Sequence, residues 1–298
     1  MKNTIFTGAG VAIVTPMHED GSVNYNVLGE MIEMQIAGGT DAIIICGTTG
    51  ESSTLTDEEH RECIRYTIER VAHRIPVIAG TGSNDTAYAI ELSKEAEKMG
   101  ADGLLVVTPY YNKTSQRGLI AHYTAIADAV NIHIILYNIP SRTGVTISID
   151  TFKVLGEHKN IAAVKEASGN ISAIARIIAE CGDKLDVYSG NDDQIVPIMA
   201  LGGKGVISVL SNVAPDVAHK IAQLCLDNNY PEAANLSEKY LSLSNTNGLF
   251  IDVNPIPVKA ALNMMGIAAG PCRLPLYEME DEKKAKLRSI LTDLGMIK

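Results

Sequence analysis

One lysine stands where an amine could take part in covalent chemistry. The segment from Ile161 to Gly169 reads Ile-Ala-Ala-Val-Lys-Glu-Ala-Ser-Gly, so four apolar residues lead into Lys165. If these residues form a buried parallel strand, Ile161, Ala163 and Lys165 share one face, because side chains alternate along a strand. Burial favours the neutral amine, which can attack a carbonyl carbon. The segment therefore predicts a Schiff-base lysine, and an exposed strand-end lysine paired with Glu166 is the simpler alternative.

Polar side chains that suit the same chemistry follow other apolar runs. They are Thr48, Thr49, Tyr111, Tyr137 and Arg142. Each has an ordinary explanation, since threonines cap strands, tyrosines lie half-buried at rims, and arginines occupy solvated turns. Together they form one chemistry, because hydroxyl groups can relay protons and an arginine can bind a carboxylate through two parallel hydrogen bonds. The combination favours a catalytic interpretation.

The order of apolar runs indicates how these residues are brought together. Strands are expected at residues 10–16, 41–46, 76–79, 103–107, 133–136, around Lys165, at 185–188 and at 205–210, with helical patterns such as 25–37 between them. This alternation predicts the α/β class and a closed (β/α)8 TIM barrel, in which the carboxyl ends of all strands meet at one face. An open doubly wound sheet is the competitor. It is disfavoured because Gly80-Thr81-Gly82-Ser83-Asn84-Asp85 lacks the last glycine of a dinucleotide-binding turn.

After residue 230 the pattern changes. Helices are expected at residues 232–243, 257–265 and 280–294 with no strand between them. The sequence thus predicts a catalytic barrel over residues 1–230 and a C-terminal helical extension over residues 231–298, packed on the barrel or at a subunit contact.

Composition limits the possible partners and the compartment. The formal net charge is −10 and there is no basic run, which argues against nucleic acid and anionic membrane surfaces. The five cysteines include no Cys-x-x-Cys pair, and no His-x-x-x-His pair occurs. These features predict a reduced, cytoplasmic protein without disulfides, zinc or another metal. No apolar run approaches the roughly 18 residues of a membrane span.

Three motifs resemble one family. Gly47-Thr48-Thr49-Gly50-Glu51, the stretch from Tyr137 to Gly144 (Tyr-Asn-Ile-Pro-Ser-Arg-Thr-Gly), and Val164-Lys165-Glu166-Ala167 are similar to those of the dihydrodipicolinate synthase (4-hydroxy-tetrahydrodipicolinate synthase) family. The resemblance extends over essentially the whole chain. It implies a lyase of the class I aldolase type that condenses pyruvate with L-aspartate-4-semialdehyde in the diaminopimelate route to lysine. It also implies no cofactor beyond the covalent imine, and a homotetramer built as a dimer of tight dimers.

The resemblance also implies residue roles. Lys165 would form the imine with pyruvate and then the nucleophilic enamine, while Tyr137 would donate and accept protons beside it. Thr49 would connect Tyr137 to Tyr111 in a hydroxyl relay, with Tyr111 supplied by the neighbouring subunit. The remaining roles concern substrate contact. Thr48 and Thr49 would hold the pyruvate carboxylate, Arg142 the carboxylate of the aldehyde, and Gly190 and Ile207 would lie close to the imine.

Two other aldolases share the implied fold and lysine. N-acetylneuraminate lyases usually have Ser-Thr at the place of Thr48-Thr49, and both they and 2-keto-3-deoxy-gluconate aldolases lack an arginine at the place of Arg142. Arg142 is therefore the main discriminator. A barrel that only senses a keto acid is a further alternative, but loss of Lys165 or Tyr137 would be its signature and both are present.

The resemblance also implies a regulatory pocket. Some members of the family bind lysine at the tight-dimer interface, and the residues that fit this pocket are Ser52, Ser53, His60, Asn84 and Tyr110. Asp57 replaces a histidine of lysine-sensitive members, and Tyr88 replaces a glutamate that pairs with the amine of the ligand. Asp57 compensates only if its carboxylate points inward, so weak or absent inhibition by lysine is expected.

Overall fold

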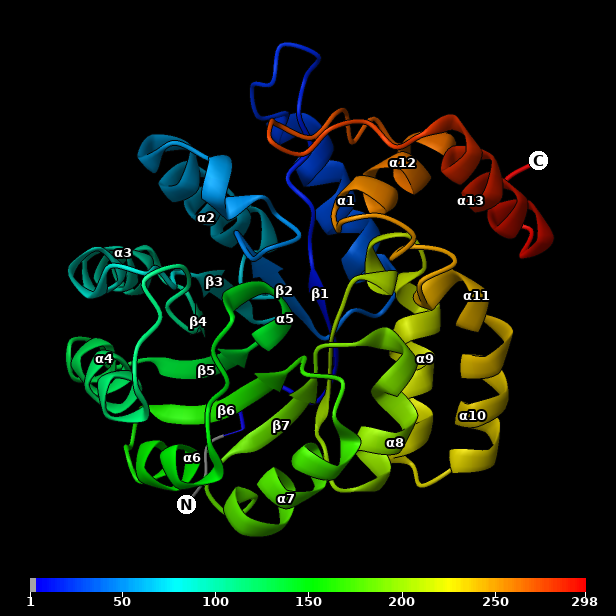
Figure 1. The fold of residues 1–298 in the computed structure, drawn as a ribbon. Helices are drawn as coiled ribbons and strands as arrows, with labels where there is room; N and C mark the ends of the chain where they lie inside the picture. The colour runs from blue at the N-terminus through cyan, green and yellow to red at the C-terminus, as the bar shows by residue number, and fades with distance from the viewer. Residues whose placement is uncertain (1–3) are drawn as a thin grey trace.

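The computed structural model describes residues 4–298 of the chain. Within these residues, eight parallel strands close into a barrel in sequence order (Figure 1). The strands are β1 (Gly8–Ala12), β2 (Ala42–Ile45), β3 (Val77–Gly80), β4 (Gly103–Val107), β5 (His133–Asn138), β6 (Ile161–Glu166), β7 (Asp186–Ser189) and β8 (Gly205–Ser208). The predicted TIM barrel is confirmed.

Helices surround the barrel and continue beyond it. They are α1 (Tyr25–Ala37), α2 (Asp57–Val71), α3 (Thr86–Met99), α4 (Gln116–Asp128), α5 (Pro140–Thr143), α6 (Ile149–Gly156), α7 (Ile171–Cys181), α8 (Ile195–Ala200), α9 (Pro215–Leu226), α10 (Tyr230–Lys239), α11 (Leu241–Ser244), α12 (Ile256–Met264) and α13 (Asp281–Asp293). Figure 1 shows α10 and α11 beside α9, with α12 and α13 near one end of α1. The predicted helix over 232–243 is divided at Tyr240. The division of the chain after residue 230 coincides with the start of α10 and stays a prediction.

Apolar side chains form two buried clusters because each strand is covered on both faces. The larger cluster lies between strands and helices and includes Val11, Ile43 and Val164. The smaller one fills the barrel and includes Ile44, Ile135 and Tyr137, among others. Alternation along β5 and β6 therefore points Tyr137 and Lys165 into the barrel.

One expectation about β6 is wrong. Ile161 belongs to the outer cluster, although Ala163 belongs to the inner one. The reason is a register shift, since Ile134 pairs with Ile161 whereas Ile135 pairs with Ala163. The additional residue, Ala162, changes the face on which the preceding side chain lies. Lys165 is beyond the irregularity and keeps the predicted inward direction.

The first strand also differs from the expected span of residues 10–16. It runs from Gly8 to Ala12, and the chain then leaves the sheet. Beyond this point loop side chains hold it, because the Val14 amide donates to Asn212 Oδ1 and Thr15 Oγ1 donates to the Gly50 carbonyl. These bonds connect the chain after β1 to the turns after β8 and β2.

Candidate active site

The predicted lysine lies inside the barrel beside a tyrosine. Lys165 and Tyr137 are directly paired across β6 and β5, and each is 5% exposed. The Lys165 Nζ lies 4.3 Å from the centroid of the Tyr137 ring. An aromatic face attracts a cation and gives the amine an apolar neighbour. The two side chains that the sequence placed at the centre of the chemistry are thus in contact.

Lys165 is not an exposed strand-end lysine paired with Glu166. Glu166, the next residue, points to the other side of β6, where its carboxylate accepts from Asn138 Nδ2 and from the Ser168 amide, each at 2.7 Å. Burial raises the pKa of Glu166. Across residues 4–298, no ion pair joins Glu166 to Lys165. The amine is therefore not engaged as a structural salt bridge with its neighbour.

A tight turn after β2 carries the two threonines. Cys46 and Glu51 at its ends have left-handed backbone conformations, with φ of 56° and 53°. Thr49 is 3% exposed and its Oγ1 accepts from Asn254 Nδ2 at 3.0 Å, whereas Thr48 is half-buried. Positive φ at residues other than glycine is uncommon and costs free energy, so surrounding contacts must hold this turn.

Arg142 lies on the short helix α5 that follows β5. Its side chain is exposed, and Nη2 donates to the Asn254 carbonyl at 3.0 Å. In the described part of the chain the guanidinium forms no ion pair with a carboxylate. The remaining N–H groups of the fork are thus available for an anionic ligand.

Tyr111 is the predicted site residue that a single chain does not bring into the site. It is 90% exposed, with φ of 69°, and makes no hydrogen bond through its hydroxyl to the other site residues described. A bulky side chain exposed on a strained backbone is unusual for an isolated surface. Its contribution from a neighbouring subunit stays a prediction.

Gly190 lies beside Lys165, whereas the closeness of Ile207 to the imine stays a prediction. A Cβ built on Gly190 would lie 3.2 Å from Lys165 Cε and 2.7 Å from Ala167 Cβ. Ile207, on β8, is fully buried and belongs to the same interior cluster as Tyr137. A side chain at position 190 would meet Ala167 first and Lys165 next, so a residue larger than glycine would force neighbouring atoms to move.

Two polar residues of the site were not anticipated from the sequence. Asp192, after β7, is buried and accepts from the Val209 and Leu210 amides at 3.0 and 2.9 Å. Burial raises the pKa of Asp192, although bonds to Ser208 and the backbone and the charge of Lys165 act in the opposite direction. Asn254 contacts both Thr49 and Arg142. No sequence signal singled out either residue, since both belong to ordinary polar turns.

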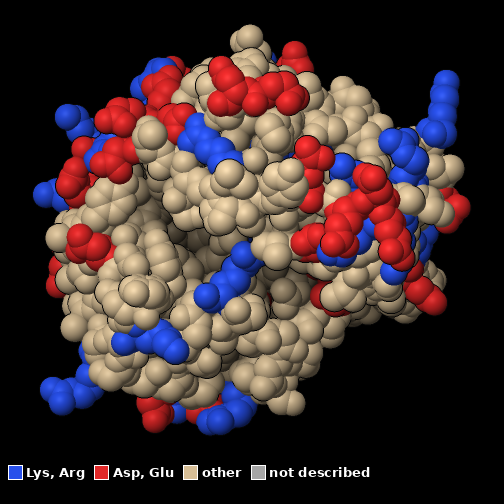
Figure 2. Space-filling view, turned by 45° about the horizontal axis from the view of Figure 1, so that its top comes forward, with Lys and Arg blue, Asp and Glu red and all other residues tan. Residues whose placement is uncertain are grey.

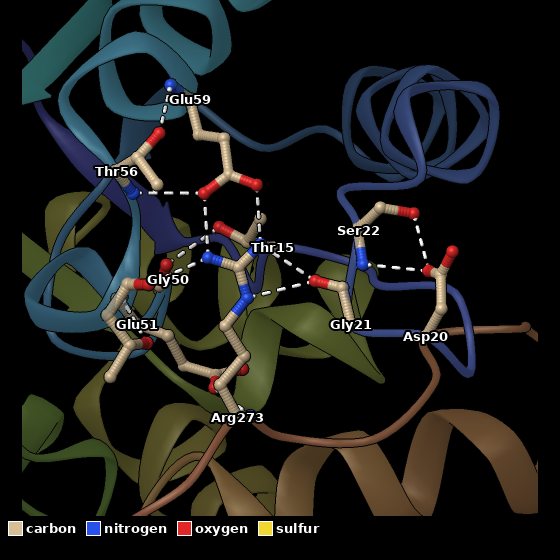
Figure 3. Close-up of polar contacts among 10 residues, drawn as sticks. Thr15, Asp20, Gly21, Ser22, Gly50, Glu51, Thr56, Glu59 and Arg273 are labelled. Atoms are coloured by element: carbon tan, nitrogen blue, oxygen red, sulfur yellow. Dashed lines mark hydrogen bonds and ion pairs between the residues drawn. The ribbon is translucent and has the colours of Figure 1, made fainter.

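The C-terminal residues hold the turn after β2 in place. Lys259 on α12 and Glu51 form a buried ion pair, with Nζ 2.6 Å from Oε1. The backbone amide of Arg273 donates to the other Glu51 oxygen at 2.9 Å. Figure 3 shows the Arg273 guanidinium between the Glu59 carboxylate and the Gly21 carbonyl. The extension and the barrel therefore share one polar network.

The predicted regulatory residues surround a small cavity beside the barrel mouth. The cavity has a volume of about 230 Å³ and is lined by Ser52, Ser53, Leu55, Asp57, His60, Gly82, Ser83, Tyr88, Leu92 and Tyr110. Asn84 does not line it; the Asn84 carbonyl accepts from Asn112 Nδ2. The Tyr88 hydroxyl donates to Asp57 Oδ1 at 2.7 Å. Burial lowers the pKa of His60, whose Nε2 lies 2.8 Å from the Gly80 carbonyl oxygen.

The face in Figure 2 is hollowed near its middle. Most of the surface around the hollow is uncharged, and Lys and Arg side chains lie at its edge. Within residues 4–298, no group of three or more His, Cys, Asp and Glu side chains is placed to hold a metal ion. A search of the same residues finds no helix with the length and apolar character needed to cross a membrane.

Comparison with known proteins agrees with this arrangement. The family model described as "Dihydrodipicolinate synthetase family" matches residues 5–294. A 4-hydroxy-tetrahydrodipicolinate synthase of Acetivibrio thermocellus is 54% identical over 100% of both chains, and one of Lachnoclostridium phytofermentans is 56% identical over 98% of this chain and 99% of its own. The solved dihydrodipicolinate synthase of Aquifex aeolicus is 47% identical, with a TM-score of 0.95 over 98% and 99% of the chains.

The fold and these similarities define the class of the protein, a (β/α)8-barrel lyase. The chain belongs to the dihydrodipicolinate synthetase family. Its activity is that of a 4-hydroxy-tetrahydrodipicolinate synthase, as the sequence predicted.

Proposed function

We propose that this chain condenses pyruvate with L-aspartate-4-semialdehyde through an imine on Lys165. The observation that carries the proposal is the amine itself, which is buried inside the barrel, lies against Tyr137 and is free of Glu166. A primary amine at this position can attack the ketone carbon of a keto acid that enters the barrel.

The covalent steps follow from this placement. The Lys165 nitrogen attacks the ketone carbon of pyruvate, and loss of one water gives the imine. Loss of a methyl proton then gives the enamine, whose carbon attacks the aldehyde carbon and forms the new carbon–carbon bond, while the aldehyde oxygen takes up a proton. The amine of the aldehyde substrate finally displaces Lys165 and closes the ring. Tyr137, whose ring contacts the Lys165 amine, is the proposed hydroxyl-bearing side chain for these proton transfers.

The other residues have supporting roles in this proposal. Thr48 and Thr49 hold the pyruvate carboxylate, and the exposed fork of Arg142 binds the carboxylate of the aldehyde. Thr49 passes protons between Tyr137 and Tyr111. The 90% exposure of Tyr111 supports its burial by a second copy of the chain, in a homotetramer built from tight dimers. The cytoplasm is the proposed compartment, the diaminopimelate route to lysine the proposed pathway, and no metal or organic cofactor is required by these steps.

Borohydride reduction in the presence of pyruvate tests the covalent step. A pyruvate-derived mass increase on Lys165 alone, absent from Lys165→Ala, is expected in peptide mass analysis. A wild-type protein that is folded but gives no adduct contradicts the proposal and favours a keto-acid sensor. Comparison of aspartate semialdehyde with N-acetylmannosamine as second substrate then separates the proposed reaction from that of an N-acetylneuraminate lyase.

A further inference from the structure

Two buried polar residues lie behind the lysine and the tyrosine of the site, on the outer face of the sheet. Asn138 and Glu166 are direct partners in the register of β5 and β6, and Tyr137 and Lys165 form the pair before them. Because side chains alternate along a strand, the later pair points outward while the earlier one points into the barrel. Asn138 is 2% exposed and Glu166 is 1% exposed. Asn138 Nδ2 donates to Glu166 Oε2 at 2.7 Å, so an amide and a carboxylate are joined in this outer layer.

The other oxygen atoms of both side chains bind backbone amides. Asn138 Oδ1 accepts from the Ile147 amide at 3.1 Å, and Glu166 Oε1 accepts from the Ser168 amide at 2.7 Å. Asn138 therefore donates through its nitrogen and accepts through its oxygen at the same time. A side-chain amide can do both, whereas a carboxylate can only accept. The pair thus joins three segments, namely the end of β5, the chain at residue 147 and the turn after β6.

The loop closed by these bonds contains Arg142. It leaves β5 at Asn138, forms the short helix α5 and returns at Ile147, so the Asn138 side chain joins its two ends. Within residues 4–298, the exposed Arg142 guanidinium has one side-chain hydrogen bond, which it donates to the Asn254 carbonyl. The position of Arg142 therefore depends on how the base of its loop is held.

The carboxylate that holds Asn138 belongs to the residue next to Lys165. The backbone supports the same connection, because the Ala167 amide donates to the Asn138 carbonyl at 2.9 Å. The loop of Arg142 is thus attached to β6, the strand that carries the amine, as well as to its own strand. One buried hydrogen bond connects the side of the site that holds Lys165 to the side that holds Arg142.

We propose that Asn138 and Glu166 are positioning residues that hold the loop of Arg142 in a fixed place relative to Lys165, and so set the affinity for the carboxylate of the aldehyde substrate. The inference rests on the proposed function, in which Arg142 binds that carboxylate. It adds that selection of the second substrate depends on a bond behind the sheet, between two side chains that point away from the barrel interior.

Single replacements remove the complementarity of the pair. Asn138→Asp leaves two carboxyl groups facing each other, and Glu166→Gln leaves one side-chain oxygen for the two donors that Glu166 accepts from. We expect the KM for aspartate semialdehyde to rise about tenfold or more in each variant. The rate of pyruvate adduct formation on Lys165 should change less than about threefold, because the inward face of β6 is unaltered.

The double variant Asn138→Asp/Glu166→Gln reverses the direction of the bond. The nitrogen of the new glutamine can donate to the new aspartate, and its oxygen can accept from the Ser168 amide. The aspartate can still accept from the Ile147 amide, so every bond of the wild-type pair has a counterpart. The KM for aspartate semialdehyde should therefore return to within about threefold of the wild-type value.

Two further variants separate positioning from general effects. Asn229→Asp is the matched control, because Asn229 Nδ2 also donates to a carboxylate at 2.7 Å, that of the exposed Glu232 on α10. It should keep the wild-type KM. Adding Asn138→Asp to Arg142→Ala should raise the KM for aspartate semialdehyde less than about threefold further, because the group that the pair positions is already lost.

Wild-type KM in the folded single variants, or a double variant as impaired as they are, would overturn the inference. Equal losses of adduct formation and of aldehyde affinity would also overturn it, since they indicate a general disturbance of the barrel. If Asn138→Asp does not fold, Glu166→Gln gives the same comparison, because it keeps one of the two bonds. A wild-type protein without adduct, or Arg142→Ala with unchanged KM, would instead remove the proposed function on which the inference rests.

Discussion

The Lys165 amine contacts the face of the Tyr137 ring, with 4.3 Å between Nζ and the ring centroid. The two residues are direct neighbours in the register of β6 and β5, so the backbone ladder fixes their contact. The ring provides an apolar surface on one side of the amine, and the same side chain carries a hydroxyl. One side chain can thus shape the environment of the nucleophile and also provide a proton-transfer group.

Tyr137→Phe separates these two functions. The ring is retained, so the contact with Lys165 and the stability of the barrel should be preserved, whereas the hydroxyl is lost. We expect kcat to fall about a hundred- to ten-thousandfold, the range typical of general acid–base groups. Steady-state kinetics and the yield of reduced pyruvate adduct on Lys165 measure the two effects. A variant with kcat within about threefold of wild type would remove Tyr137 from the proton transfers.

Gly190→Ala should reduce both stability and imine formation. The new Cβ would lie 2.7 Å from Ala167 Cβ and 3.2 Å from Lys165 Cε, so neighbouring atoms must move. Overpacking of this kind costs about 1–3 kcal/mol. Urea unfolding and the rate of adduct formation test the prediction. Combining the change with Ala167→Gly removes the nearer clash and should restore part of the stability; no recovery would mean that Ala167 is not the obstacle.

The Glu59–Arg273 pair should make stability depend on pH. Its hydrogen bond to Arg273 lowers the pKa of Glu59 below the ordinary value of 4.5. A carboxyl group whose pKa is lowered by folding contributes stability that is fully present above pH 4.5 and lost as the pH falls through the lowered value. Arg273→Met should therefore cost about 1–3 kcal/mol at pH 7, and its difference from wild type should shrink below pH 4.5.

A control for this prediction lies on α2, the helix that carries Glu59. Among the described residues, the exposed Arg65 forms ion pairs with Glu62 and Glu69 at the surface, so Arg65→Met should cost much less stability than Arg273→Met. Urea unfolding of the three proteins at pH 7 and at pH 4 measures the free energies. Equal losses for the two variants, or a difference for Arg273→Met that grows at low pH, would contradict the assigned role of the pair.

Lysine should inhibit this enzyme weakly or not at all. Asp57 lines the candidate pocket, but its carboxylate accepts from Tyr88 and lies 3.4 Å from Arg61. Burial and the neighbouring Asp57 raise the pKa of Tyr88 to about 12, so the phenol is neutral near pH 7. Neither residue offers a free anion to an incoming ammonium group. A charge-assisted hydrogen bond of about 1.5–3 kcal/mol, equal to about ten- to a hundredfold in affinity, is therefore missing.

An activity titration with L-lysine checks this expectation. Micromolar inhibition of the wild-type protein would show that Asp57 serves as the partner of the ligand despite its contacts. Tyr88→Glu supplies a carboxylate at the cavity and should strengthen inhibition at least tenfold, while Tyr88→Phe serves as the matched variant without the new charge.

The sequence could predict that Lys165 and Tyr137 lie together, because barrel geometry positions them. Apolar runs between glycine-rich breaks define the strands, and closure of the sheet brings Lys165 and Tyr137 together. The irregularity at Ala162 could not be predicted, because an extra residue in a strand leaves no mark in an apolar run. Asn254 was missed for another reason. It is 205 residues from Thr49, and the extension that carries it follows no repeating pattern.

The attachment of the extension also affects how the enzyme is made. All eight strands are complete by Ser208, whereas Asn254, Lys259 and Arg273 leave the ribosome later. A nascent chain can therefore enclose Lys165 in a barrel before the turn that carries Thr49 has its final supports. The turn after β2 can therefore gain its contacts with Asn254, Lys259 and Arg273 only after the C-terminal extension has been synthesised.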